Sequence, residues 1–126
     1  MKKIIQTSLA PQPIGPYSQA VLVNGFLYTS GQIAIDPSTN EYLQREIEFE
    51  TALVMKNLKA ILEEAGMDFS NVVKTSIFLK DMNDFAKVNA VYGHYFSGNF
   101  PARETVQVSV LPKDAKVEIS IVACVY

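Results

Sequence analysis

The stretch NVVKTSIFLKD, residues 71–81, decides the fold. It is rich in β-branched residues and alternates in polarity, which predicts a strand. The segments on both sides of it carry apolar residues at three- and four-residue spacing, which indicates amphipathic helices. Strand–helix–strand units favour right-handed crossovers, so we expect both helices to cover one face of a mixed sheet.

The two helices have recognisable ends. The first is predicted from about residue 46 to residue 65, with Gly66 stopping it. The second has Asn83 as its expected N-cap, while Gly98 and Pro101 are expected to end it. The apolar stripe of the second helix consists of Phe85, Val88, Tyr92, Tyr95 and Phe96. Each helix therefore has an apolar side to turn toward the sheet.

Further strands are predicted on both sides of this central unit. Upstream, QAVLVNGFLYTSGQIAI (residues 19–35) consists of two apolar runs joined by Asn24 and Gly25, a dipeptide typical of a tight β-hairpin. Downstream, strands at about residues 104–110 and 116–125 are joined by LPKDA. The expected order is β-β-α-β-α-β-β, which is an α+β fold.

Alternation along the last two strands predicts which side chains are buried. The apolar sets, which we expect to face the helices, are Val106, Val108 and Val110, and Val117, Ile119, Ile121, Ala123 and Val125. The opposite sets are Arg103, Thr105, Gln107 and Ser109, and Glu118, Ser120, Val122 and Cys124. That mixed face is either solvated or the contact surface of an oligomer, and the high apolar content of the chain favours the oligomer.

Composition restricts the class of protein. A chain of 126 residues suits one domain, expected to span residues 1–126. The net charge of −2 disfavours a nucleic-acid surface. A single cysteine, Cys124, allows no intrachain disulfide, and neither a signal peptide nor a membrane span is recognisable, so we expect a cytoplasmic protein. With one histidine, His94, there is no metal-ligand spacing, and a histidine-assisted nucleophile is available only if His94 serves.

Two residues remain as candidates for chemistry. Arg103 is one of two arginines, and its guanidinium fork matches a carboxylate at two points. Its anion is either a ligand or a structural acid such as Glu104, although alternation puts Glu104 on the opposite face. Glu118 lies between apolar residues, where burial raises a carboxyl pKa and suits proton transfer, unless it is a charge at the rim of the sheet.

The spacing of these two residues has a consequence for assembly. If the last two strands pair as a hairpin with Val110 opposite Lys116, Arg103 lies on the order of 17 Å from Glu118 along the sheet. One site that uses both residues would then take them from two subunits.

The chain resembles a known family over nearly its whole length, from about residue 13 onward. The motifs IGPYSQA, YTSGQI, NLKAILEEAG, VVKTSIFLKDMNDFAKVNAVY, FPARE and LPKDAKVEI are similar, in this order, to those of the Rid (YjgF-type) reactive-intermediate deaminases, most closely the RidA type. The resemblance implies a chorismate-mutase-like α+β fold and a homotrimer whose sheets form a barrel with sites between subunits. It also implies hydrolysis of 2-imino acids such as 2-iminobutanoate and 2-iminopropanoate, or their enamines, to 2-oxo acids and ammonia. No metal or cofactor is implied.

The resemblance also implies roles for particular residues. Arg103 would hold the substrate carboxylate, and Glu118 would position the attacking water or carry a proton to the leaving ammonia. Further substrate-binding residues implied by the motifs are Tyr17, Ser30, Gly31, Gln32, Asn89 and Thr105. The chain departs from the common family pattern at Glu104, at Thr105, where many members have cysteine, and at Ser120, where many have a second acid.

Three other functions stay open at this point. A non-enzymatic module would use the same cleft to bind a small carboxylate and regulate a partner. A ribonuclease or translation inhibitor is disfavoured by the negative charge and the single histidine. A holdase-type chaperone is the third.

Overall fold

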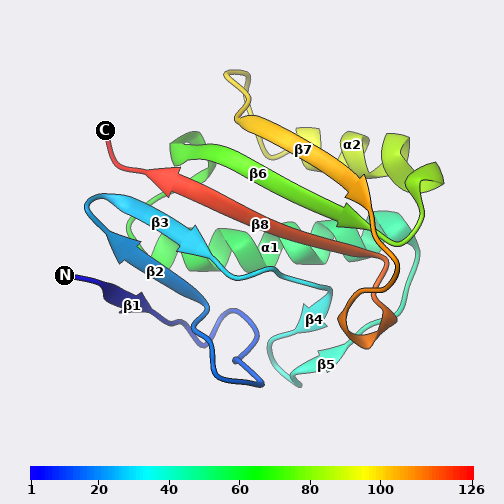
Figure 1. The fold of residues 1–126 in the computed structure, drawn as a ribbon, viewed down its shortest axis with the longest axis horizontal. Coiled ribbons are helices and arrows are strands. Elements are labelled where there is room, and N and C mark those ends of the chain that lie inside the picture. The colour runs from blue at the N-terminus through cyan, green and yellow to red at the C-terminus, as the bar shows by residue number, and fades with distance from the viewer.

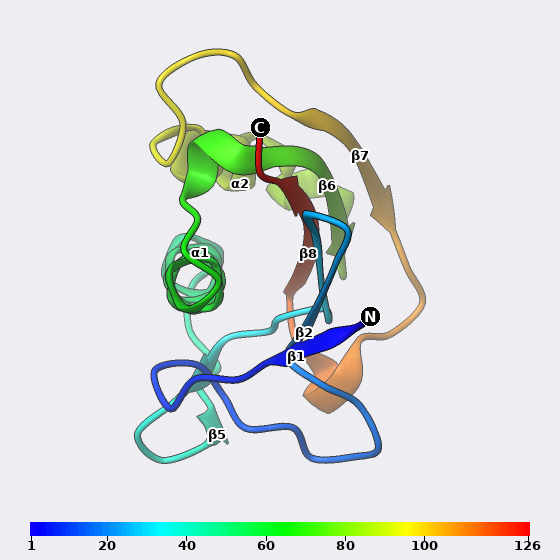
Figure 2. The same ribbon diagram turned by 90° about the vertical axis from the view of Figure 1, so that its left-hand side faces the viewer.

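The computed structural model describes residues 1–126 and contains a mixed six-stranded sheet with both helices on one face (Figures 1 and 2). The strands of this sheet are, in spatial order, β1 (Lys3–Ile5), β2 (Ala20–Val23), β3 (Phe26–Thr29), β8 (Val117–Cys124), β6 (Val72–Leu79) and β7 (Ala102–Gln107). A separate small sheet pairs β4 (Ile35–Asp36) with β5 (Glu41–Tyr42). The helices are α1 (Ile47–Glu64) and α2 (Phe85–Gly93). The predicted α+β fold is confirmed; β1 and the β4–β5 pair were not predicted.

The β2–β3 hairpin forms where the sequence predicts it. Val23 pairs with Phe26, and the two turn residues have positive φ angles, 51° at Asn24 and 80° at Gly25. Such angles are what a two-residue hairpin turn requires. The second strand is shorter than predicted, because after Thr29 the chain touches β8 only at a single bridge, Gln32 to Ile119, before it leaves the sheet.

The first helix agrees with the prediction to within a residue at each end. Gly66 has a φ of 74°, its N–H donates to the carbonyl of Glu63, and the N–H of Met67 donates to the carbonyl of Leu62. This pair of bonds satisfies carbonyls that a helix end leaves free, and the positive φ is easiest for glycine. Gly66 therefore stops α1 as expected.

The second helix is shorter than predicted. Asn83 is not its N-cap: the side chain of Asp81 accepts from the N–H of Asn83 and starts a 3-10 turn (Met82–Asp84) that leads into α2. The helix ends at Gly93, before the predicted stop at Gly98. Tyr95 and Phe96 lie beyond α2, where both rings pack on Phe69.

The order of the last strands corrects the prediction. β7 and β8 do not form a hairpin, because β6 lies between them, parallel to β7 and antiparallel to β8 (Figure 1). The crossover through α2 returns β7 parallel to β6, as a strand–helix–strand unit requires. The predicted pairing of Val110 with Lys116 is therefore wrong.

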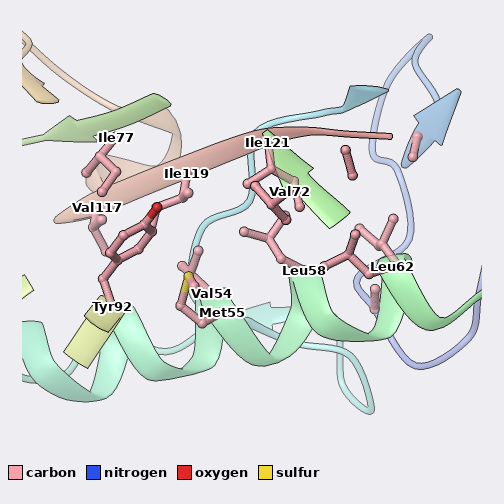
Figure 3. Packing of buried hydrophobic residues seen from close by; sticks show 14 of the residues in the cluster. Val54, Met55, Leu58, Leu62, Val72, Ile77, Tyr92, Val117, Ile119 and Ile121 are labelled. Carbon is pink, nitrogen blue, oxygen red and sulfur yellow. The ribbon is translucent and has the colours of Figure 1, made fainter. Parts of the chain in front are cut away.

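The core lies between the sheet and the helices. Fully or almost fully buried residues from β6, β8 and both helices meet there (Figure 3). They include Val54, Leu58, Leu62, Ile77, Tyr92, Val117, Ile119 and Ile121. The apolar set predicted for β8 thus faces the helices, which is confirmed.

The prediction for the faces of β7 is wrong. Thr75 of β6 pairs with Arg103 and Ile77 pairs with Thr105, and directly paired residues share a face. Because Thr75 and Ile77 are buried under the helices, Arg103 and Thr105 lie on the helix side. Val106 lies on the open face and is 43% exposed. Polar and aromatic side chains of α2 cover the helix side of this edge strand, so Val106, the one valine of β7, is left for the other face.

The open face of the sheet carries large exposed apolar side chains. They are Ile4, Phe26, Tyr28 and Val106, each at least 40% exposed. Neither helix combines the length and apolar character needed to cross a bilayer.

Candidate functional site

Arg103 lies on β7 in close contact with α2. Its Nη1 donates to Oδ1 of Asn89 at 2.7 Å. The guanidinium carbon lies 5.6 Å from the ring centre of Phe85 and 5.2 Å from that of Tyr92. The two ion pairs of the chain are Lys74–Glu104 and Lys80–Asp114. Arg103 is therefore held in place but has no acidic partner.

The structural alternative for Arg103 is an ion pair with Glu104, and the fold does not allow it. Glu104 lies on the open face, where it binds Lys74 at 2.7 Å and accepts from the hydroxyl of Ser76. Its bonds to Lys74 and Ser76 hold the pKa of Glu104 below its usual value. The charge of Arg103 remains available to a ligand.

An open groove of about 460 Å³ adjoins the guanidinium. It is lined by Asn89, Tyr92, Gly93, Phe100, Pro101 and Arg103. A groove of this size accommodates a small organic anion. We call Phe85, Asn89, Tyr92 and Arg103 the arginine half-site.

Glu118 lies on the open face of β8, opposite Phe78 of β6. The side chain is half-buried, and burial raises the pKa of its carboxyl above the usual value. A small cavity of about 80 Å³ adjoins it. The residues lining this cavity include Gln12, Tyr17, Gly31, Gln32, Lys113 and Glu118. We call Tyr17, Gly31, Gln32 and Glu118 the glutamate half-site.

Gly31 is required by the position of Glu118. A Cβ added to Gly31 would lie 2.7 Å from both Cδ and Oε2 of the Glu118 side chain. Only a residue without a side chain leaves room for the carboxylate there.

We expect Gly31→Ala to fold and to lose most of the activity that depends on Glu118. The added methyl displaces the carboxylate, a flexible group that can move without disturbing the core, so kcat should fall about tenfold or more while the thermal midpoint changes little. Steady-state kinetics beside thermal unfolding checks this. Glu63→Ala is the control, since Glu63 is exposed on α1 and belongs to neither half-site. Unchanged turnover in Gly31→Ala would show that the place of the carboxylate is unimportant.

The other predicted residues divide between the two half-sites. The hydroxyl of Ser30 donates to the carbonyl of Ser18 at 2.5 Å and so fixes the turn before Gly31. Asn89 contacts Arg103 directly. Thr105 lies two residues along the same side of β7, and its hydroxyl oxygen is buried without a hydrogen-bond partner.

The two half-sites do not meet within one chain. Glu118 pairs with Phe78 and Arg103 pairs with Thr75, so the two Cα atoms are three residues and two strand spacings apart, about 14 Å. Their side chains also leave the sheet on opposite faces. The sequence-based estimate of this distance assumed the wrong strand pairing. The observed pairing nevertheless keeps Arg103 and Glu118 apart within one chain.

Sequence reasoning missed some residues around the two candidates. The sequence predicts Phe85 and Tyr92 only as members of an apolar stripe. With Asn89 they recur at positions i, i+4 and i+7, which places a polar group between two rings on one side of a helix. Lys113 approaches the cavity of Glu118 from a turn in which its φ is 56°. Nothing in the local sequence indicated that contact.

Fold and site define a class of protein, a small α+β domain with a pre-oriented arginine on one side of its sheet and a half-buried glutamate on the other. A family model described as Endoribonuclease L-PSP matches residues 7–125. The chain belongs to this family, which is the Rid or YjgF family.

Similar proteins cover the whole chain. The 2-iminobutanoate/2-iminopropanoate deaminase of Homo sapiens is 49% identical over 123 residues, which are 98% of this chain and 90% of the relative. A conserved Rid family protein from Yersinia pestis has a TM-score of 0.97 at 49% identity, over 99% of this chain and 100% of that one. The structure of E. coli TdcF with bound serine has a TM-score of 0.94 at 40% identity, over 98% and 99% of the two chains. Names among the relatives thus support imine deamination as the kind of activity.

Proposed function

We propose that this protein hydrolyses 2-imino acids and their enamine tautomers to 2-oxo acids and ammonia, with 2-iminobutanoate and 2-iminopropanoate as substrates. The observation that carries the proposal is the guanidinium of Arg103, which is fixed by α2, adjoins a groove and lacks an acidic partner. The human relative is named for this activity, and TdcF holds serine, an amino acid with the same carboxylate.

The reaction requires two bonds to form at one carbon and two to break. Arg103 holds the carboxylate of the substrate through its free guanidinium donors. Water adds to the imine carbon while one of its protons passes to a carboxylate oxygen of Glu118, and the carboxyl then gives that proton to the imine nitrogen, which yields a carbinolamine. In the second step the hydroxyl proton of the carbinolamine passes through Glu118 to the nitrogen, the C=O bond forms as the C–N bond breaks, and ammonia leaves. Burial raises the pKa of Glu118, which makes its carboxylate a stronger proton acceptor than an ordinary glutamate.

We infer that the working unit is a homotrimer with its sites between subunits. The two half-sites lie on opposite faces of one sheet, so a single small ligand reaches both only if they come from different chains. The exposed apolar residues of the open face give such an assembly a contact surface. Each site would then combine the arginine half-site of one subunit with the glutamate half-site of its neighbour.

The test is imine hydrolysis in competition with a chemical trap. An amino-acid oxidase generates 2-iminobutanoate, semicarbazide captures it, and the purified protein competes with semicarbazide. The proposal requires that the protein lowers the semicarbazone yield and raises the yield of 2-oxobutanoate. Unchanged semicarbazone yield, with 2-oxobutanoate still bound, would favour the carboxylate-binding module. Degradation of RNA by the same preparation, abolished with Glu118→Gln, would favour the nuclease that the family description names.

Glu118→Gln is expected to lower kcat roughly 10²–10⁴-fold, the usual contribution of a general acid–base residue. Glutamine keeps the size of the side chain but cannot exchange a proton. The dissociation constant for 2-oxobutanoate should change little, because Arg103 supplies that binding. Kinetics and calorimetry on the same sample measure the two effects. Full turnover in Glu118→Gln removes this residue from the mechanism.

The same variant should be more stable than wild type at neutral pH. The pKa of Glu118 is raised in the folded chain, so the cost of ionising it is absent below the pKa of an unfolded glutamate, about 4.3, and complete above the folded pKa. Stability from this group therefore falls as pH rises through that interval. Thermal midpoints at pH 7 and below pH 4, with the exposed Glu63→Gln as control, check the sign.

A further inference from the structure

Three side chains of α2 surround the guanidinium of Arg103. Phe85, Asn89 and Tyr92 stand at positions i, i+4 and i+7, so they share one side of the helix. The two rings lie 5.6 and 5.2 Å from the guanidinium carbon, and Asn89 accepts one N–H at 2.7 Å. Four of the five guanidinium N–H donors have no partner in the chain and remain for a carboxylate.

The ring of Tyr92 is held in place by contacts of its own. Tyr92 is 4% exposed, and its hydroxyl donates to Oγ1 of Thr75 at 2.9 Å. Thr75 is the residue of β6 that pairs with Arg103 in the sheet. The ring of Tyr92 also packs against Phe96 at 4.9 Å between centres. Strand, ring and guanidinium thus hold one another at a defined position.

We propose that Phe85 and Tyr92 form an aromatic clamp that orients Arg103 for a planar carboxylate. Both are positioning residues, since they act through Arg103. A free arginine loses much rotamer freedom when it binds a ligand, and a clamp removes that loss in advance. Contact with the two rings also adds cation–π attraction, which favours this position of the guanidinium. The inference rests on the proposed function only in naming a 2-oxo or 2-imino carboxylate as the ligand.

The chain contains a matched control for this clamp. Its other arginine, Arg45, lies 5.9 Å from the ring centre of Phe49 on the outer side of α1. Phe85 and Phe49 are 38% and 43% exposed, so replacing either by leucine disturbs little of the core. The variants Phe85→Leu and Phe49→Leu therefore remove equivalent arginine–phenylalanine contacts, one in the arginine half-site and one outside it.

The experiment measures binding, turnover and the order of the guanidinium. For Phe85→Leu we expect the Kd of 2-oxobutanoate and the KM for 2-iminobutanoate to rise roughly three- to tenfold, with kcat within about twofold of wild type. Phe49→Leu should match wild type in all three values. The two arginine Nε–H signals in ¹H–¹⁵N NMR, assigned with Arg45→Lys, should show that only Arg103 loses its ring-current shift in Phe85→Leu.

The other possible results decide separately on the clamp and on the proposed function. Equal Kd values in Phe85→Leu and Phe49→Leu overturn the clamp, and so does a loss of kcat with Kd and KM unchanged. If wild type binds 2-oxobutanoate but does not hydrolyse the imine, the proposed function fails and the clamp is judged by Kd alone. If wild type binds no 2-oxobutanoate, the Arg103 signal decides: an unchanged shift in Phe85→Leu rejects the clamp.

Discussion

Arg103→Ala is expected to lose imine hydrolysis on the order of 10²- to 10³-fold in kcat/KM, the usual effect of truncating one partner of a desolvated charge pair. Arg103 is the only cation in its groove, so no neighbour replaces it. Its side chain contributes one hydrogen bond, to Asn89, and lies on the edge strand of the sheet. The variant should therefore keep the wild-type thermal midpoint and oligomeric state, measured by thermal unfolding and light scattering.

Arg103→Lys separates the shape of the cation from its charge. An ammonium group is a point charge that neither spans both carboxylate oxygens nor stacks between Phe85 and Tyr92. We expect it to recover little of the lost kcat/KM. Arg45→Lys is the control, because Arg45 is exposed and its side chain donates only to the carbonyl of Gln44. Wild-type kinetics in Arg103→Lys would mean that any positive charge in the groove suffices.

Whether the sequence correctly predicts the buried face of a strand depends on the strand's place in the sheet. β8 has neighbours on both edges and α1 across one face. Its apolar residues are therefore predicted to face the helices, and they do. β7 has one neighbour, and its one valine, Val106, lies on the open face. A face buried in an assembly and a face buried inside one chain produce the same alternation of apolar residues. The pattern of β7 alone does not distinguish them.

The order of the strands also could not be predicted from local sequence patterns. Turn residues and periodicity report on neighbours in sequence, whereas the insertion of β6 between β7 and β8 is a long-range pairing. The prediction joined β7 to β8 because they are consecutive, as most neighbouring strands are. The position of Glu118 beside Gly31 is another such pairing. Motif resemblance indicated both residues, but only the fold shows that a Cβ at Gly31 would come within 2.7 Å of the Glu118 side chain.

Mixed oligomers of Arg103→Ala and Glu118→Gln subunits are expected to regain activity that neither variant has alone. If a site takes its arginine from one subunit and its glutamate from the next, some interfaces of a mixed trimer join an intact arginine half-site to an intact glutamate half-site. At equal proportions, random assembly makes about one site in four complete, so activity should reach about one quarter of wild type. From a background near zero, this is a large effect.

The measurement is imine hydrolysis by subunits refolded together at several ratios. Complementation predicts that activity follows the product of the two subunit fractions, with its maximum at equal proportions. If one chain supplied both residues to its own site, every mixture would stay at the background of the single variants.

A second mixture tests the same geometry without relying on rescue. Wild type combined with the double variant Arg103→Ala/Glu118→Gln should lose activity with the square of the wild-type fraction, because both contributors to a site must be wild type. Sites within single chains would give a linear loss. If both residues serve one site, as proposed, the separation of about 14 Å and the opposite faces of Arg103 and Glu118 predict the quadratic curve. A linear curve would mean that two chains never share a site, and the proposed homotrimer would then have no part in the chemistry.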